Sequence, residues 1–190
     1  DSLAIDLKQF DFKVAAGYFK NEANIKGIDP MQVQGTVSSA LDLGSLYQAI
    51  KWPDFSIAGQ LELDGQVDGT YSTDTLTYGI RNKKEVYISS IPTFNIKNTL
   101  TNGYFKLNTL PAAIEKIAYS LEAVATDNKI QNAKIALKDI DIKALNNYIK
   151  GYANIKDFQN MSLDANVQAD INLADIKQVY PLDSVDIAGN

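Results

Sequence analysis

The sequence predicts an all-β protein, mainly antiparallel, in which a long, curled and groove-like sheet built from repeats carries a few short helices. Two observations lead to this fold class. Long segments alternate strictly between apolar and polar residues, and a segment of about fifty residues recurs 130 positions later. No run of about 18 apolar residues, the length that a transmembrane helix needs, interrupts this pattern.

Alternation is clearest in three segments. In SLDANVQADINL (162–173) every second residue is apolar and every intervening one is polar, and MQVQGTVSSALDL (31–43) and SIAGQLELDGQVDGTY (56–71) closely follow the same pattern. Since successive side chains of a strand point to opposite faces, each segment predicts a strand with one buried face. These strands exceed the usual five or six residues. Gly59, Gly65 and Gly69 fall in the apolar phase, and we expect them where the sheet bends.

Weaker patterns complete the expected elements. A phase slip near Gln9 predicts a β-bulge in the first strand, and Asn102-Gly103 has the composition of a two-residue hairpin turn. Pro111 followed by AAIEKIA predicts a helix that starts at the proline. Further strands are expected at 3–14, 85–91, 94–100, 104–107, 118–125 and 134–142, and further short helices at 43–50, 143–149 and 173–179.

The repeat defines the organisation of the chain. YFKNEANIKGIDPM (18–31) and YIKGYANIKDFQNM (148–161) agree at seven of fourteen positions. The match extends without a gap over 10–59 against 140–189, and such strict spacing indicates a duplicated structural unit. The second copy stops where the first continues as an alternating strand. We therefore expect residues 1–190 to be one β-rich fragment of a longer modular protein.

Composition bears on the function classes. A net charge of −5, with seventeen lysines and Arg81 spread along the chain, argues against nucleic acid as a partner. The absence of Cys and His removes thiolate chemistry, the commonest general base and the commonest transition-metal ligand. Asp139 and Asp141, two apart on one expected strand face, and Asp64 and Asp68 are interpreted as solvated acids. We expect no enzyme, no catalytic residue, no metal and no cofactor.

Three stretches carry a family resemblance. ALDLGSLYQAI (40–50), IAGQLELDGQVDG (57–69) and NGYFKLNTLPAAIEKIAYSLEA (102–123) resemble the C-terminal region of AsmA-like proteins in its Bacteroidetes-type form, a family related to the TamB-like group. The resemblance implies a periplasmic protein, anchored to the inner membrane by an N-terminal helix that this fragment lacks. It also implies a curled sheet with an apolar concave face, and a role in phospholipid transport or in outer-membrane assembly.

The expected function is therefore that of a cell-envelope module that carries lipid acyl chains in an apolar β-groove and maintains outer-membrane lipid. The alternative is a structural or adhesion-type β-sandwich scaffold with a sealed core, and an enzyme comes third. No protein partner can be named. The residues expected to line the groove are Val33, Val37, Leu41, Ile57, Leu61, Leu63, Val67, Leu163, Val167 and Ile171.

Overall fold

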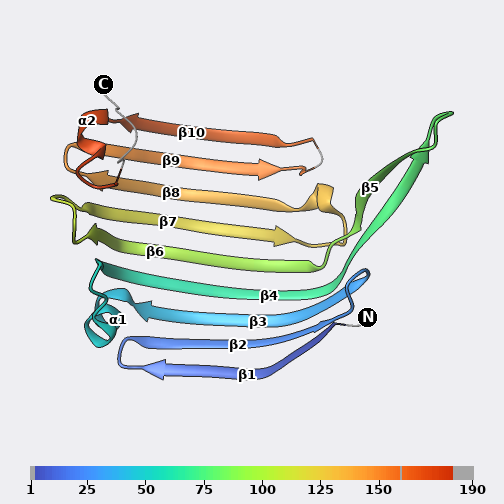
Figure 1. The fold of residues 1–190 in the computed structure, drawn as a ribbon, viewed down its shortest axis with the longest axis horizontal. Helices are drawn as coiled ribbons and strands as arrows, with labels where there is room; N and C mark the ends of the chain where they lie inside the picture. The colour runs from blue at the N-terminus through green and yellow to red at the C-terminus, as the bar shows by residue number, and fades with distance from the viewer. Residues whose placement is uncertain (1–2, 159, 182–190) are drawn as a thin grey trace.

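A computed structural model describes residues 3–158 and 160–181. They form an antiparallel sheet of ten strands that is not closed, as Figure 1 shows, and this confirms the predicted fold class. The elements are β1 (Ala4–Val14), β2 (Gly17–Lys26), β3 (Met31–Asp42), α1 (Leu43–Ile50), β4 (Phe55–Tyr78), β5 (Lys83–Ser90), β6 (Thr93–Leu107), β7 (Ile114–Ala125), η1 (Ile130–Asn132), β8 (Lys134–Ala144), β9 (Asn147–Lys156), β10 (Ser162–Asp170) and α2 (Leu173–Ile176).

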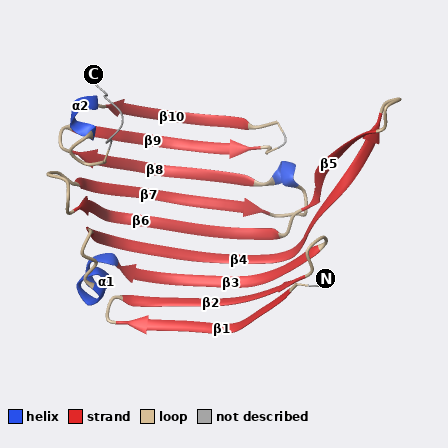
Figure 2. Cartoon of the chain, viewed as in Figure 1, coloured by secondary structure: helices blue, strands red, loops and turns tan. Residues whose placement is uncertain are grey.

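The sheet is a meander with one departure. Its strand order is β1-β2-β3-β4-β6-β7-β8-β9-β10, and β5 pairs with the far part of β4 outside this path. Figure 2 shows α1 and α2 at the same end of the sheet, where β3 and β10 finish, whereas the β4–β5 hairpin leaves from the opposite end. Antiparallel neighbours joined by short turns need no crossover helices, and within 3–158 and 160–181 the helices α1, η1 and α2 lie at the ends of the sheet and form no layer over either face.

The interior of the described chain is small. Its buried apolar residues are Ala16, Ile91, Ala125 and Ala133, and Tyr71, Phe94, Ile130 and Phe158 pack around the last three. In residues 3–158 and 160–181 no second sheet covers the first. The sealed β-sandwich of the alternative interpretation is therefore not the architecture found here.

The predicted bulge near Gln9 is confirmed. Leu7 pairs with Ala23 and Phe10 with Asn21, so Lys8 and Gln9 together oppose Glu22. A second bulge corrects the turn predicted at Asn102-Gly103. Those residues lie inside β6, which runs on from Thr93 to Leu107, and together they oppose Gly59 of β4.

The Asn-Gly pair is compatible with either structure because both need a residue with positive φ. Asn102 has φ of 52°. The long neighbour β4 continues past this point and pairs with both parts of β6, which favours a bulge over a reversal of the chain.

Two predicted helices are wrong. Pro111 and its successors form no helix, and the segment from Ile114 onward is β7, whose apolar side chains pair with β6 and β8. Residues 143–149 form the end of β8, a tight turn in which Leu145 has φ of 55°, and the start of β9. Neither segment is long enough for its local helical spacing to outweigh strand pairing on both sides. The helices expected near Leu43 and Leu173 are present, the latter limited to Leu173–Ile176.

Local geometry recurs at the spacing of the sequence repeat. β8 and β9 have the bounds of β1 and β2 displaced by 130 residues, and the bulge between Leu7 and Phe10 recurs between Leu137 and Ile140. The first caps recur as well, since Asp42 precedes α1 and Asn172 precedes α2, and each accepts a hydrogen bond from its helix. These equivalences follow the spacing of the predicted repeat of 10–59 in 140–189, of which 182–189 lie outside the described residues.

Gly59 tests the bulge in β6. Its φ is 129°, and a Cβ there would lie 2.8 Å from the Cα of Gly103. Gly59→Ala should therefore lower the free energy of unfolding by roughly 1–3 kcal/mol, measured by urea denaturation. The control Gly44→Ala lies in α1 with φ in the normal range, its Cβ would lie 3.3 Å from the Asp42 Oδ1, and its stability should stay within about 1 kcal/mol of the parent. Equal stability of Gly59→Ala and the parent would contradict the bulge.

Asp42 makes the anchoring of α1 dependent on pH. Its carboxylate accepts hydrogen bonds from the Ser45 backbone N–H and the Gln60 side chain, both at 2.7 Å, and these hold its pKa below the ordinary aspartate value. Because the folded pKa is lowered, this stabilisation is complete at neutral pH and is lost as pH falls through that pKa. Thermal melts should show Asp42→Asn below the parent at pH 7, with the difference shrinking in acid. A difference that stays constant down to pH 3 would exclude this role.

Candidate functional site

Strand pairing gathers one side of every strand on the main path into a single apolar surface, which we call the apolar face. The pairs Ile5/Ile25, Ile25/Val33 and Leu41/Leu61 connect β1 to β4 in phase. Directly paired residues of neighbouring strands point to the same side of a sheet. The pairs Val67/Phe94, Ile96/Ala123, Ala123/Ile135, Ile135/Ile155 and Ile155/Leu163 carry the same side across to β10.

Nine of the ten residues predicted to line a groove lie on the apolar face, in two separate groups. β3 supplies Val33, Val37 and Leu41, and β4 supplies Ile57, Leu61, Leu63 and Val67. Leu163 and Val167 lie on β10, which is separated from β4 by four strands. Ile171 follows the end of β10 and lies outside the strands.

The structure adds apolar residues that the sequence analysis did not single out. β1 contributes Ile5, Leu7, Phe10 and Phe12, and all four are exposed. β6 and β7 contribute Phe94, Ile96, Leu100 and Leu121 across the centre of the sheet. The sequence of β1 does alternate between apolar and polar residues, but the bulge divides it into two short runs of opposite phase. Its apolar side was therefore not recognised as one face.

A hollow of about 260 Å³ lies on this face where β2, β3, β4 and β6 meet. Gly35 and Gly65 lie at its floor, and the apolar side chains around it are Ala23, Ile25, Val33, Val37, Val67 and Ile96. Small residues create the space, because a Cβ on Gly65 would come within 2.9 Å of Val37 Cγ1. Pockets for drug-sized ligands measure about 300–1,000 Å³. This hollow is therefore of a size to hold part of an acyl chain, not a whole lipid.

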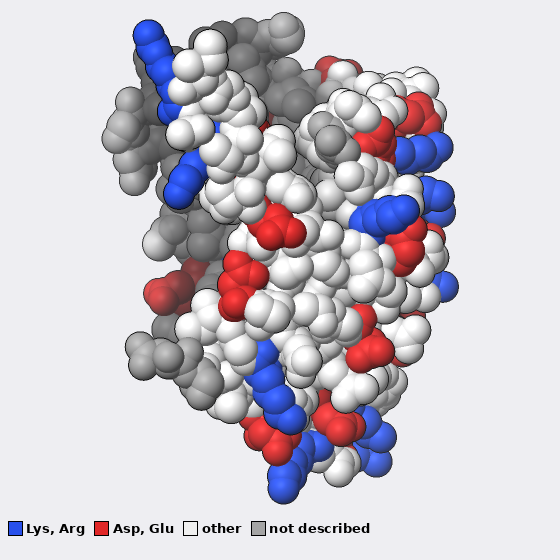
Figure 3. Space-filling model, turned by 90° about the vertical axis from the view of Figure 1, so that its right-hand side faces the viewer, with Lys and Arg blue, Asp and Glu red and all other residues white. Residues whose placement is uncertain are grey.

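The opposite side of the sheet is polar and carries ion pairs between neighbouring strands. Lys116 pairs with Asp141 at 2.5 Å, Lys138 with Glu122 at 3.6 Å and Lys143 with Glu115 at 3.7 Å, all between β7 and β8. The Lys116 ammonium group holds the pKa of Asp141 below its usual value. In the side view of Figure 3, acidic and basic side chains follow one another along the right-hand margin. Exposed pairs of this kind contribute little to stability.

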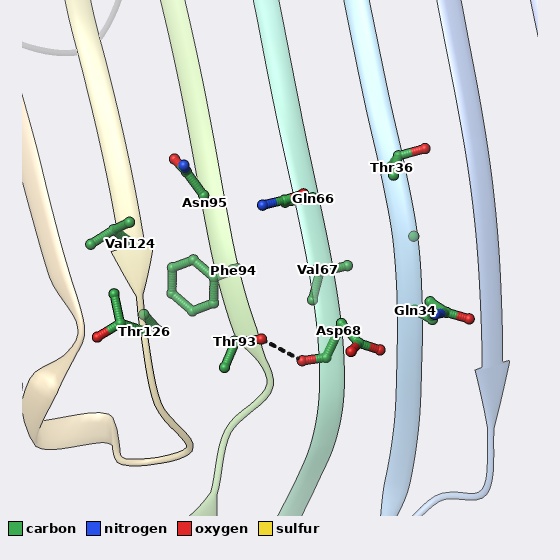
Figure 4. Close-up of a pocket in the computed structure, with 12 residues that line it drawn as sticks. Gln34, Thr36, Gln66, Val67, Asp68, Thr93, Phe94, Asn95, Val124 and Thr126 are labelled. Atoms are coloured by element: carbon green, nitrogen blue, oxygen red, sulfur yellow. Dashed lines mark hydrogen bonds between the residues drawn. The ribbon is translucent and has the colours of Figure 1, made fainter.

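A second hollow, of about 570 Å³, lies on the polar side across β3, β4, β6 and β7. Figure 4 shows the amide and hydroxyl groups of Gln34, Thr36, Gln66, Thr93 and Asn95 around it, with the Thr93 hydroxyl donating to the Asp68 carbonyl at 2.8 Å. These side chains can donate and accept hydrogen bonds, but the residues that line the hollow include no Ser, Cys, His, Lys or Tyr. The sequence analysis missed this hollow because alternation does not distinguish polar residues that line a hollow from other polar residues on the solvent side of a strand.

The acids considered as sites remain separated. Asp64 and Asp68 lie on the polar side of β4, and Asp139 is the extra residue of the β8 bulge with φ of 54°. The bulge corrects the expectation that Asp139 and Asp141 share a regular strand face, since Lys138 and Asp141 share it instead. Among the described residues no group of three or more acidic side chains is placed to hold a metal ion.

Trp52 lies in the short connection between α1 and β4. Its ring stacks on Phe55 with centroids 5.2 Å apart, and Phe55 in turn lies 6.1 Å from Phe105. Across β4 and β6, Phe55 pairs with Leu107 and Phe105 pairs with Ile57. This aromatic group closes one end of the apolar face.

None of the helices described is both long and apolar enough to cross a bilayer. Comparisons of the chain with protein-family models, with curated proteins and with solved structures returned no match.

The different burial of the two groups of apolar-face residues predicts that substitutions in them lower the free energy of unfolding by different amounts. Leu63 is half-buried between its partners Ser39 and Asn98, and Leu63→Asp should cost about 2–4 kcal/mol of unfolding free energy because it removes an apolar side chain and places a charge at a partly buried position. Val167 is 54 % exposed on the last strand, so Val167→Asp should cost about 1 kcal/mol or less. Denaturation of both variants beside Asp164→Asn, a neutral control on the polar side of β10, measures the contrast. Equal losses at positions 63 and 167 would contradict it.

Proposed function

We propose that this chain is a non-enzymatic cell-envelope module that binds lipid acyl chains along its apolar face. One observation supports the proposal above all others: nine hydrogen-bonded strands place their apolar side chains on one face, and no other described element forms a layer over it. Monomeric proteins rarely leave a continuous apolar surface of this extent without a partner. The AsmA-like resemblance of residues 40–50, 57–69 and 102–123 adds the cellular context.

In this proposal binding needs no bond-making step. An acyl chain lies across the apolar side chains of β2 to β6 and fills the hollow between Gly35 and Gly65, and its headgroup stays in water. Each methylene group removed from water contributes about 0.8 kcal/mol. Because neighbouring sites along the strands are alike in chemistry, a chain can move from one to the next without a large barrier, which suits transport.

The same resemblance gives the proposed location. An AsmA-like protein works in the periplasm, anchored to the inner membrane, and contributes to phospholipid transport or to outer-membrane lipid homeostasis and assembly. Immunodetection of the full-length protein in separated inner-membrane, periplasmic and cytoplasmic fractions tests this location. Recovery in the cytoplasmic fraction would contradict it.

A fluorescent fatty acid tests the binding proposal directly. A single 14-carbon chain partitions onto a membrane with an equilibrium constant of about 10⁴ M⁻¹, so uptake by an open protein face should show a dissociation constant on the order of 100 µM. Native mass spectrometry of the purified protein should also show adducts of phospholipid mass. A protein that carries no lipid and takes up no fatty acid would favour the structural or adhesion scaffold.

Two neighbouring positions on β4 provide a matched pair for the same assay. Both residues border the hollow, but Val67 lies on the apolar face, whereas Gln66 is in the polar phase of β4 and pairs with Thr36 and Asn95. Val67→Asp should weaken fatty-acid binding at least tenfold, because it removes about two methylene contacts and introduces a charge. Gln66→Asp introduces the same charge one residue away and should leave binding unchanged. Equal effects of the two substitutions would show that binding does not use the apolar face.

A further inference from the structure

The β4–β5 hairpin leaves the sheet as a separate two-stranded arm. β4 pairs with β6 as far as Asp68 and with β5 from Ser72 onward. Gly69, with φ of 133°, lies against Pro92 where the two neighbours diverge. Figure 1 shows the arm rising away from the other strands at the end of the sheet opposite α1 and α2.

The base of the arm is firmly attached. The Asp29 carboxylate, in the turn between β2 and β3, accepts a hydrogen bond from the Thr73 N–H at 3.1 Å and another from the Thr73 hydroxyl, and these bonds lower its pKa. On the other strand, Ile91 is buried against Ala125 and Ala133, and its N–H donates to the Asn128 carbonyl at 3.0 Å. The arm is therefore held in a defined direction from its base.

The outer part of the arm has exposed apolar side chains on both of its sides. Leu76 and Tyr78 pair with Glu85 and Lys83 on one side, and Val86 pairs with Thr75 on the other. Leu76, Tyr78 and Val86 are all exposed, and Ile80 in the turn is as exposed as in an extended peptide, at 104 %. In the described chain no further strand pairs with this two-stranded arm, and these side chains are left exposed to solvent.

The turn also concentrates positive charge on an acidic protein. Arg81, the only arginine of the chain, lies within four positions of Lys83 and Lys84, and the chain as a whole has a net charge of −5. The segment from Tyr78 to Lys84 contains three basic residues and no acidic one. A tip of this composition is complementary to an anionic partner and unlike the mixed-charge polar side of the sheet.

We infer that the tip of the β4–β5 arm docks on the surface of a bilayer that contains anionic phospholipid. Exposed aliphatic and aromatic side chains beside lysine and arginine suit the boundary between headgroups and acyl chains, where tyrosine is enriched and basic groups reach phosphates. An acidic protein surface would pair with the basic side chains of the tip but would offer no apolar contact for the exposed Ile80. The inference rests on the arm alone and stands independently of acyl-chain binding by the sheet.

Co-sedimentation with vesicles tests the inference. The protein should pellet with phosphatidylcholine vesicles that contain roughly one third phosphatidylglycerol and should stay in solution with pure phosphatidylcholine. Replacing Arg81, Lys83 and Lys84 by Gln together should weaken binding about a hundredfold, since each cation near an anionic surface contributes roughly fivefold. Tyr78→Ser combined with Ile80→Ser should also weaken it at least tenfold. Both variants should keep the parent's thermal melt because the tip lies outside the main sheet.

A matched control separates the tip from net charge. Lys26, Lys97 and Lys134 are exposed on the polar side of three different strands, and their joint replacement by Gln removes the same charge. This control should bind anionic vesicles like the parent. A control that loses as much binding as the tip variant, or a parent that ignores anionic vesicles, would overturn the inference. Tip-dependent binding to polyglutamate without binding to vesicles would overturn it too, in favour of an acidic protein.

Fluorescence gives a second measurement. In a Trp52→Phe background, Ile80→Trp places the only tryptophan at the tip. Its emission should shift to the blue with anionic vesicles and stay unchanged with neutral ones, and an unchanged spectrum in both would contradict insertion. Fatty-acid uptake measured without vesicles is unaffected by the tip variants, so the failure of either proposal can be recognised separately.

Discussion

The backbone hydrogen-bond ladder between long antiparallel strands is the interaction on which this structure depends. A globular domain of this length is usually organised around a hydrophobic core, but here the buried apolar residues described are three alanines and Ile91. Every strand on the main path except β1 and β10 pairs on both sides. Each pair fixes the next, so the ladder also decides which side chains meet on the apolar face. Stability and the candidate site therefore arise from the same register.

Bulges make this register possible over such long strands. A single added residue would turn the remainder of a strand over and mix its apolar and polar sides. In β1 and β8 the extra residue is absorbed locally, so that Leu7 and Phe10, and likewise Leu137 and Ile140, point to the same face. Asn102 and Gly103 do the same in β6. The bulges of β1 and β8 lie 130 residues apart, which is the spacing of the sequence repeat, so the bulge recurs with the repeat.

The sequence predicted those parts of the fold that depend on period alone. Alternation in 31–43, 56–71 and 162–173 placed nine of ten named residues on the apolar face, and the phase slip at Gln9 located a bulge. It failed where a short local signal competes with pairing, as at Asn102-Gly103 and after Pro111, because neighbouring strands are invisible to local spacing. The hollow at Gly65 depends on which strands lie beside β4, and the exposed tip at Ile80 depends on where the neighbouring strands stop. Local sequence patterns predict neither feature.

β4 links the two proposals because it belongs to both structures. Its 24 residues begin beside the aromatic group of Trp52 and Phe55, pass the hollow at Gly65 and Val67, and continue into the arm that ends near Ile80. At about 3.3 Å per residue this strand extends roughly 80 Å. A bilayer contacted by the tip would therefore lie at one end of a continuous strand whose other part borders the apolar face. An acyl chain leaving that bilayer would meet Val86 and Ile88 on the arm, which share a side with Tyr71 through the β4 pairing, before reaching Val67. If both proposals hold, the tip of the arm is the end of β4 at which lipid would enter.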